Sequence, residues 1–193
     1  SIHAFSSFYP KINDEQDTSA NLVLSSNALG RNKEKQILLM AETINEVSFV
    51  ETERIRDIIS QKRAMAEQSV TGNGHLLAMT AACAGMSPVA ELNHKLSGLE
   101  ATKELRRLDK TLSDNATLLS LTKELEKLHE KFRSIPIDLL LIAEENNLKE
   151  IMAKIPELWK INEEIANYKE DLILPNIREK RGEFWVADTQ VNF

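Results

Sequence analysis

The spacing of hydrophobic and polar positions divides the chain into strands at its start and helices afterwards. The opening SIHAFSSFYP is rich in aromatic and β-branched residues that partly alternate with polar ones, which predicts a strand over residues 1–9. A polar loop, KINDEQDTS, separates it from a second predicted strand over residues 19–27. Two neighbouring strands joined by one loop favour an antiparallel pair.

From Lys33 onward the apolar residues recur every three or four positions, which is typical of a helix. The first predicted helix carries its apolar face on Ile37, Leu38, Met40, Ala41, Ile44 and Val47. After a break at residues 48–49, a second helix carries Ile55, Ile58, Ile59 and Met65 as its apolar stripe. This second helix is predicted to continue to a point near Gly85.

The end of that helix, TGNGHLLAMTAACAGMSP, is unusually rich in glycine and alanine. A glycine inside a helix costs about 1 kcal/mol relative to alanine, so we expect a compensating close approach of a neighbouring helix or sheet. His75 is then expected to be a polar anchor with a hydrogen-bond partner. The predicted close-packing residues are Gly72, Gly74, His75, Ala78, Ala82 and Gly85.

Downstream, capping residues mark a series of shorter helices. Ser87 is predicted as an N-cap with Pro88 in the first helical position. Helices are expected over residues 87–98, 99–112 and 113–132, and either Ser113 or Asp114 is expected to cap the last of them. Pro136 ends this series. The nearly continuous apolar run IDLLLIA predicts a strand over residues 137–144 that is buried on both faces. A helix over 146–159, a polar connection and a strand at the end of the chain, EFWVADTQVNF, complete the pattern.

Composition and charge narrow the classes of partner. The 193 residues are 42% hydrophobic and 28% charged with a formal net charge of −6, whereas nucleic-acid binders usually carry a basic excess. The densest basic cluster, TKELRRLDK, is interrupted by acids, as is typical of a solvated helix face. No apolar run approaches the ~18 residues of a membrane helix. We therefore expect neither nucleic acid nor a membrane as a partner. The sequence begins with Ser1 and not with Met, which leads us to expect that it is a segment of a longer polypeptide.

The residue types that carry catalytic chemistry are few and dispersed. His75 and Cys83 are eight residues apart, about 12 Å of helical rise, so they cannot share a metal ion on a straight helix. The glycines follow a helical pattern and match no phosphate-binding loop. Cys83 lies among small residues and is expected to be a buried, unreactive thiol. The other candidate ligands are His3, His94 and His129, none within a metal-binding motif.

Three stretches carry a resemblance to a known family: SQKRAMAEQSVTGNGH, SPVAELNHKLSGL and TQVNF, in this order. With the residues around them, they resemble the pitrilysin/insulinase type of inverted zinc metallopeptidases, in its presequence protease branch. The resemblance implies an enzyme of four related α/β domains in two halves that close around a peptide-holding chamber. Zinc is bound there by H-x-x-E-H and a distal glutamate. That motif is absent from this chain, so the resemblance implies no catalytic, cofactor-binding or metal-binding residue here, and zinc only in the parent enzyme.

The resemblance also implies a domain organisation and a function. Residues 1–160 would be most of one non-catalytic α/β domain, residues 161–182 a linker, and residues 183–193 the first strand of a following domain. The expected fold class is α/β, a helix-rich α+β two-layer arrangement with a mixed or antiparallel sheet packed by long helices. The expected function is to enclose peptide substrates as part of the chamber wall. The expected partner is the remainder of the same polypeptide, including its catalytic N-terminal half.

Two alternatives stay open. The chain could be a stand-alone helical scaffold that binds partner helices, or a small enzyme that uses His75 or Cys83. The strands predicted over residues 1–9, 19–27 and 137–144 favour the peptidase segment over the scaffold, because a purely helical scaffold does not need them.

Overall fold

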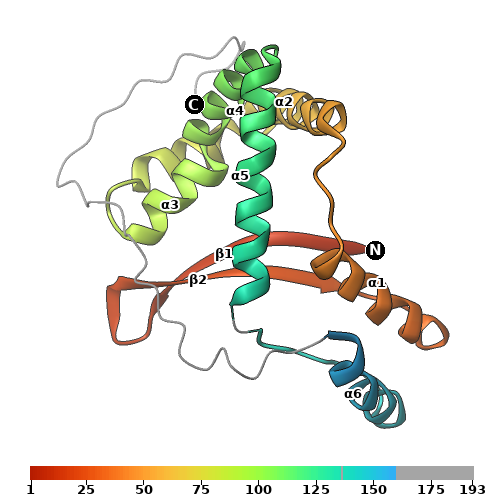
Figure 1. The fold of residues 1–193 in the computed structure, drawn as a ribbon. Coiled ribbons are helices and arrows are strands. Elements are labelled where there is room, and N and C mark those ends of the chain that lie inside the picture. Colours follow the sequence, from red (N-terminus) through yellow and green to blue (C-terminus); the bar gives the residue numbers. More distant parts are fainter. Residues whose placement is uncertain (136, 160–193) are drawn as a thin grey trace. The chain divides into compact units, whose positions relative to one another are not determined.

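The structure, a computed structural model, describes residues 1–135 and 137–159. In this part of the chain a β-hairpin precedes a short 3-10 helix and six α-helices (Figure 1). The elements are β1 (Ile2–Lys11), β2 (Asp14–Ser26), η1 (Gly30–Asn32), α1 (Lys33–Asn45), α2 (Thr52–Cys83), α3 (Pro88–Ser97), α4 (Leu99–Thr111), α5 (Asn115–Ser134) and α6 (Glu145–Trp159). The linker predicted over 161–182 and the strand predicted over 183–193 lie outside the described residues.

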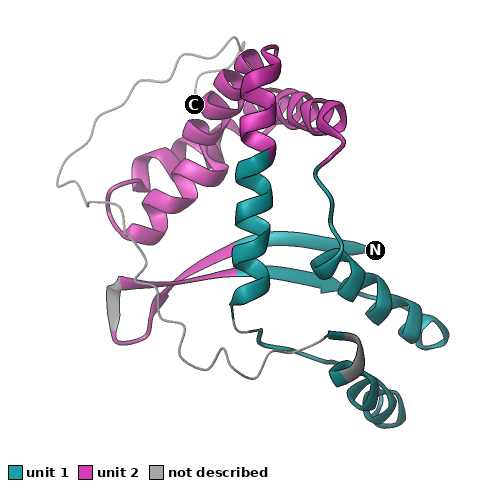
Figure 2. Ribbon diagram, viewed as in Figure 1, with its two compact units in different colours: residues 1–6, 22–49, 123–171 teal, residues 7–21, 50–122, 172–193 magenta. Residues whose placement is uncertain are grey.

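The described residues form two compact units (Figure 2). Residues 1–6, 22–49, 123–135 and 137–159 belong to the first unit, and residues 7–21 and 50–122 belong to the second. The helix-rich class predicted from the sequence is confirmed, with a two-stranded antiparallel sheet as the β component among the described residues.

The hairpin is longer than the sequence predicts. β2 begins at Asp14, so most of the segment expected to be a loop is strand and the turn comprises residues 12–13. Polar side chains join the two strands: Asn21 Nδ2 donates to Tyr9 Oη over 2.6 Å, and Lys11 pairs with Asp17 at 2.6 Å. The expected loop was wrong because cross-strand polar pairs stabilise an exposed hairpin without any apolar alternation that would mark it in the sequence.

The core of the first unit lies between α1 and α6. Its buried members are Ile37, Ala41, Ile151, Ile155 and Trp159, and Met40, Ile44 and Leu141 pack against them. The apolar stripe predicted for α1 supplies this core through positions spaced by three and four residues. Ion pairs close its margin, from Lys33 to Glu150 at 2.5 Å and from Lys154 to Glu34 at 2.6 Å.

In the second unit, α2 packs against α4 and α3, and α3 packs against α4. The 32-residue α2 continues through the glycine-rich stretch, as the sequence predicts, with one non-helical residue at Asn73 (φ −124°, ψ 20°). The helix ends at Cys83. Gly85 follows with φ 82°, a left-handed conformation that glycine adopts without a Cβ penalty.

The cap predicted at Ser87 is confirmed, and of the two candidates before α5 the structure selects Asp114. The Ser87 hydroxyl accepts a hydrogen bond from Ala90 N over 3.2 Å, with Pro88 in the first helical position. Asp114 caps α5, because its carboxylate accepts from Thr117 N at 2.9 Å and from Thr117 Oγ1 at 2.7 Å. Local chemistry therefore fixes where α3 and α5 begin.

The strand predicted over residues 137–144 is not formed. This segment carries no strand pairing within the described chain, and Leu140 and Ile142 are 83% and 90% exposed. Leu141 alone packs against the core of α1 and α6. An apolar run favours an extended backbone, but a strand also needs a neighbouring strand, which no local sequence can supply. Across the described residues, every helix is too short or too polar to cross a bilayer.

Candidate functional site

The candidate chemical residues are dispersed over the fold. His3 on β1 and His75 on α2 are exposed, whereas His94 on α3 is buried. His129 of α5 is partly buried, and its ring makes an edge contact with Phe49 at 5.9 Å between ring centres. In the described part of the chain, no three His, Cys, Asp or Glu side chains are placed to hold a metal ion. The residues present therefore do not fit the zinc site of the resembled family.

Cys83 corrects one expectation. The sequence predicts a small buried thiol, but the structure places Cys83 in an exposed position at the last residue of α2. The alanines around it suggested burial because small residues often line close contacts, yet here the helix ends at this point.

The predicted close-packing residues of α2 are not equally buried. Gly74 and Gly85 are buried, Ala78 is half-buried, and Gly72, His75 and Ala82 are exposed. A Cβ at Gly72 would meet nothing within 4 Å. The close-packing role of this face stays a prediction, and it would require a neighbour outside the described residues at its exposed positions.

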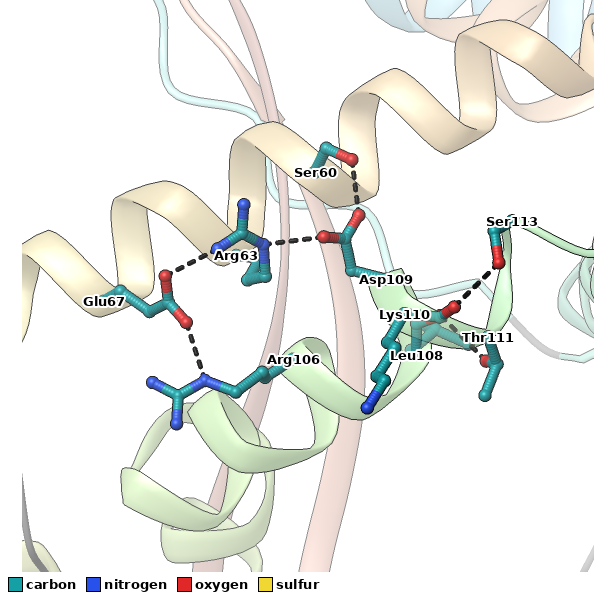
Figure 3. A network of polar contacts seen from close by, with 9 residues as sticks. All are labelled: Ser60, Arg63, Glu67, Arg106, Leu108, Asp109, Lys110, Thr111 and Ser113. Atoms are coloured by element: carbon teal, nitrogen blue, oxygen red, sulfur yellow. Dashed lines mark hydrogen bonds and ion pairs between the residues drawn. The ribbon is translucent and has the colours of Figure 1, made fainter.

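The best-defined polar constellation joins α2 to α4 (Figure 3). Arg63 Nε lies 2.7 Å from Asp109 Oδ2, and Arg63 Nη1 lies 2.6 Å from Glu67 Oε2. Glu67 also receives Arg106 Nε at 2.8 Å, and Ser60 donates its hydroxyl to Asp109. Figure 3 shows the Ser60, Arg63 and Glu67 side chains pointing from α2 toward α4. Two cations and two anions thus neutralise one another across the helix pair.

Three of the four charged side chains in this network are partly shielded from solvent. Exposed side-chain fractions are 32% for Arg63, 28% for Glu67 and 19% for Asp109, against 69% for Arg106. Surface pairs contribute at most about 1 kcal/mol, whereas hydrogen bonds to charged groups that are partly buried contribute about 1.5–3 kcal/mol. The network therefore fixes the register of α4 along α2.

Sequence reasoning did not identify Ser60, Arg63, Glu67 and Asp109. The spacing holds a signal: residues 56, 60, 63 and 67 are four, three and four positions apart, which places them on one helix face. Arg56 continues this face and donates to the Leu112 carbonyl from Nε over 3.0 Å and to Asn115 Oδ1 from Nη2 over 3.0 Å. The partner helix cannot be read from that spacing.

A second group of contacting polar side chains lies at the corner between α3 and α4. His94 is fully buried, and its Nε2 lies 3.8 Å from Glu100 Oε2. Glu91, one turn earlier, is 4% exposed and pairs with Lys95 at 3.4 Å. Gly98 lies directly against His94, because a Cβ at this position would be 2.7 Å from the His94 carbonyl oxygen. Apart from Glu100, these residues lie within SPVAELNHKLSGL, one of the stretches that carry the family resemblance.

Neither site is arranged for acid–base or nucleophilic catalysis. Ser60 donates its hydroxyl to a carboxylate that is already paired with Arg63, and no hydrogen bond to a histidine is found for Ser60 among the described residues. Outside these two sites, a hydrogen bond from Lys154, and its charge, lower the pKa of Glu34, and hydrogen bonds from Thr117 lower the pKa of Asp114. Both groups are exposed and serve as an ion-pair member and a helix cap.

Comparison with known proteins places this geometry in a family context. The family model described as "Peptidase M-16C associated" matches residues 1–108, from the hairpin to most of α4. The chain is also 29% identical over 107 residues to "Presequence protease, mitochondrial" of Danio rerio, a match that covers 55% of this chain and 10% of that protein. The chain thus spans a small part of the length of the curated relative it matches.

Proposed function

The chain belongs to the Peptidase M-16C associated family, and from this premise we propose that it is a non-catalytic part of a zinc-dependent, presequence protease-type peptidase, in which it forms chamber wall and helps to enclose peptide substrates. The observation that carries the proposal is the family match over residues 1–108. That stretch includes the hairpin, α1, α2, α3 and most of α4, and it is described as associated with a peptidase. Residues 1–160 would then be most of one domain, residues 161–182 a linker and residues 183–193 the first strand of the next domain.

The chemistry of the chain is consistent with a non-catalytic role. Its sequence contains no H-x-x-E-H, and its described residues include no group suited to zinc. Peptide hydrolysis would therefore depend on residues elsewhere in the polypeptide, and the zinc would be bound there. No step of the reaction is assigned to a residue of this chain.

The role of a wall fits the way the second unit uses its charges. The charged face of α2 is directed at α4, where Arg63 and Glu67 of α2 and Arg106 and Asp109 of α4 neutralise one another. Charges held in such pairs stiffen a helix layer and are not available to bind a substrate. The proposed partner is the remainder of the same polypeptide, and the proposed substrates are peptides held by the whole enzyme.

The test begins with the coding frame upstream of Ser1. We expect an in-frame H-x-x-E-H, and we expect the full polypeptide to cleave an unstructured peptide in a reaction that a zinc chelator stops. Replacing the glutamate of that motif by glutamine should abolish cleavage, whereas His75→Ala and Cys83→Ala in this chain should leave the rate within about twofold, because the proposal assigns neither residue a part in the reaction.

Two results would overturn the proposal. A start codon immediately before Ser1, with no H-x-x-E-H in the frame, would favour the stand-alone scaffold. Cleavage that survives loss of the upstream glutamate but is lost in His75→Ala would place the chemistry in this chain.

A further inference from the structure

The long helix α2 has two faces of opposite character, and their orientation is unusual. The face that packs on α4 is polar and holds Ser60, Arg63 and Glu67. The other side exposes large apolar side chains, with exposed fractions of 41% for Ile58, 65% for Met65, 51% for Leu76 and 62% for Met79. We call these four residues the outer face of α2.

Helical spacing places these residues in two pairs, one on each side of Asn73. Ile58 and Met65 are seven positions apart, which is close to two turns, and Leu76 and Met79 lie three positions apart beyond the deviation at Asn73. Single exposed apolar residues are common on any surface, but an apolar row along a helix whose polar row is directed inward is the reverse of the ordinary pattern. Such a surface is more stable when another apolar surface covers it.

The charges beside the outer face indicate the chemistry of what covers it. Arg54 and Lys62 are exposed next to Ile58 and Met65, and neither has an ion pair with another described residue. Counting 100° per residue, no acidic residue of α2 falls within about 60° of Met65. A matching surface would be apolar at its centre and would carry carboxylates at the positions that meet Arg54 and Lys62.

The length of the relative points to a source for that surface. The matched stretch is 10% of the length of the relative, so under the proposed function most of the polypeptide lies outside this stretch and can supply the covering surface. Resting on the proposed function, we infer that the outer face of α2 is the surface on which another part of the same longer polypeptide docks. That part would present an apolar patch with an acidic margin. Methionine suits this role because its flexible side chain adapts to the shape of a partner.

Oxidation of methionine by dilute hydrogen peroxide, followed by mass spectrometry, tests the inference on the intact full polypeptide. The rate at each methionine in the native protein is divided by the rate at the same residue in urea. We expect this ratio to be at most about one tenth for Met65 and Met79, because a covered thioether is oxidised slowly. Met152, 59% exposed on α6 and outside the outer face, serves as the comparison within the same sample.

Ratios for Met65 and Met79 within about twofold of unity would show an uncovered face and overturn the inference. Protection that disappears when the protein is diluted about fiftyfold would also overturn it, because docking within one polypeptide does not depend on concentration whereas pairing with a second copy does.

A matched pair of variants adds a directed perturbation. Met65→Glu puts a charge on the outer face, and Ala64→Glu puts the same charge on the neighbouring exposed position, which points to another side of the helix. We expect oxidation of Met79 to rise severalfold in the first variant and to stay unchanged in the second. Equal rates in the two variants would contradict the inference, and the wild-type ratios decide the matter if Met65→Glu does not fold.

The peptide-cleavage assay on the same samples separates this inference from the proposed function. Chelator-sensitive cleavage without protection of Met65 and Met79 overturns the docking surface alone. Protection without cleavage overturns the proposed function and leaves a docking surface of another role.

Discussion

Replacement of Gly98 by alanine should destabilise the α3–α4 corner through a steric clash. The new Cβ would lie 2.7 Å from the His94 carbonyl oxygen and 2.9 Å from both His94 Cα and Nδ1. Two of these three atoms belong to the backbone, so they cannot rotate away. Gly98 N also donates to the His94 carbonyl over 3.1 Å, which holds the two segments in contact. The φ of −90° at Gly98 is open to any residue, so the cost is steric and not conformational.

The magnitude follows from two opposing effects. Overpacking in a buried site costs about 1–3 kcal/mol, and the reduced freedom of the unfolded chain returns about 0.4–1 kcal/mol. The free energy of unfolding should therefore fall by about 1–2 kcal/mol, which for a chain of this size lowers Tm by about 2–8 °C. Urea unfolding followed by circular dichroism on the 193-residue chain measures the difference.

Gly72→Ala is the matched control, because a Cβ at Gly72 meets nothing within 4 Å. Alanine in an exposed helix interior should raise the free energy of unfolding by about 0.5–1 kcal/mol. The two substitutions are chemically identical and should act in opposite directions. If Gly98→Ala proves as stable as Gly72→Ala, the close contact with His94 is absent and the reasoning fails.

Three further predictions concern the ion-pair network, a helix cap and the core. Asp109→Ala removes the partner of Arg63 and should lower the free energy of unfolding in urea by about 1–3 kcal/mol. Glu104→Ala breaks an exposed pair and should lower it by less than about 1 kcal/mol. Equal losses in the two variants would argue against a shielded network. The pKa of Asp114 is lowered in the folded state, so its contribution is present above the ordinary pKa of 3.8 and is lost as the pH falls through the folded pKa. The stability difference between wild type and Asp114→Asn should accordingly shrink below about pH 4 in urea unfolding at a series of pH values, and a difference that does not change with pH would contradict the assignment. Ile151→Ala, at a core position 9% exposed, should lower the free energy of unfolding by about 2–4 kcal/mol, and a loss below about 1 kcal/mol in urea unfolding would show that α1 and α6 are not packed as described.

The predictions for Ile151, Gly98 and Asp114 differ in how much of their basis could be derived from the sequence. Ser87 and Pro88 mark one helix start by local chemistry, and Ser113 or Asp114 marks another. The structure forms the caps at Ser87 and Asp114. Gly98 was placed at a helix boundary by its sequence, but its contact with His94 became visible only in the folded corner. A cap needs only the residues next to it, whereas a clash depends on how two helices meet.

Two wrong predictions, for residues 137–144 and for Cys83, and the contact that the sequence did not reveal all involve features outside the local pattern of residues. The run over 137–144 has the composition of a buried strand, yet it lacks a paired neighbour in the described structure, and Cys83 lies among small residues but at an exposed helix end. The charges of TKELRRLDK indicate a solvated face, and Arg106 is indeed mostly exposed, but it reaches Glu67 on another helix. The missing strand pairing and the contact of Arg106 depend on partners far away in the sequence, and the exposure of Cys83 depends on where α2 ends.

The sequence by itself therefore determined the helix-rich class, the order of the helices, the cap at Ser87, the absence of H-x-x-E-H and the family resemblance, because these follow from residue identity and short-range spacing. Only the tertiary structure decided that the polar face of α2 is turned toward α4, that Arg63 pairs with Asp109 46 positions away, and that the apolar outer face is left exposed. The hydrophobic pattern of a helix tells which residues share a side, but the side that is covered depends on the free energy of packing against every other element of the protein.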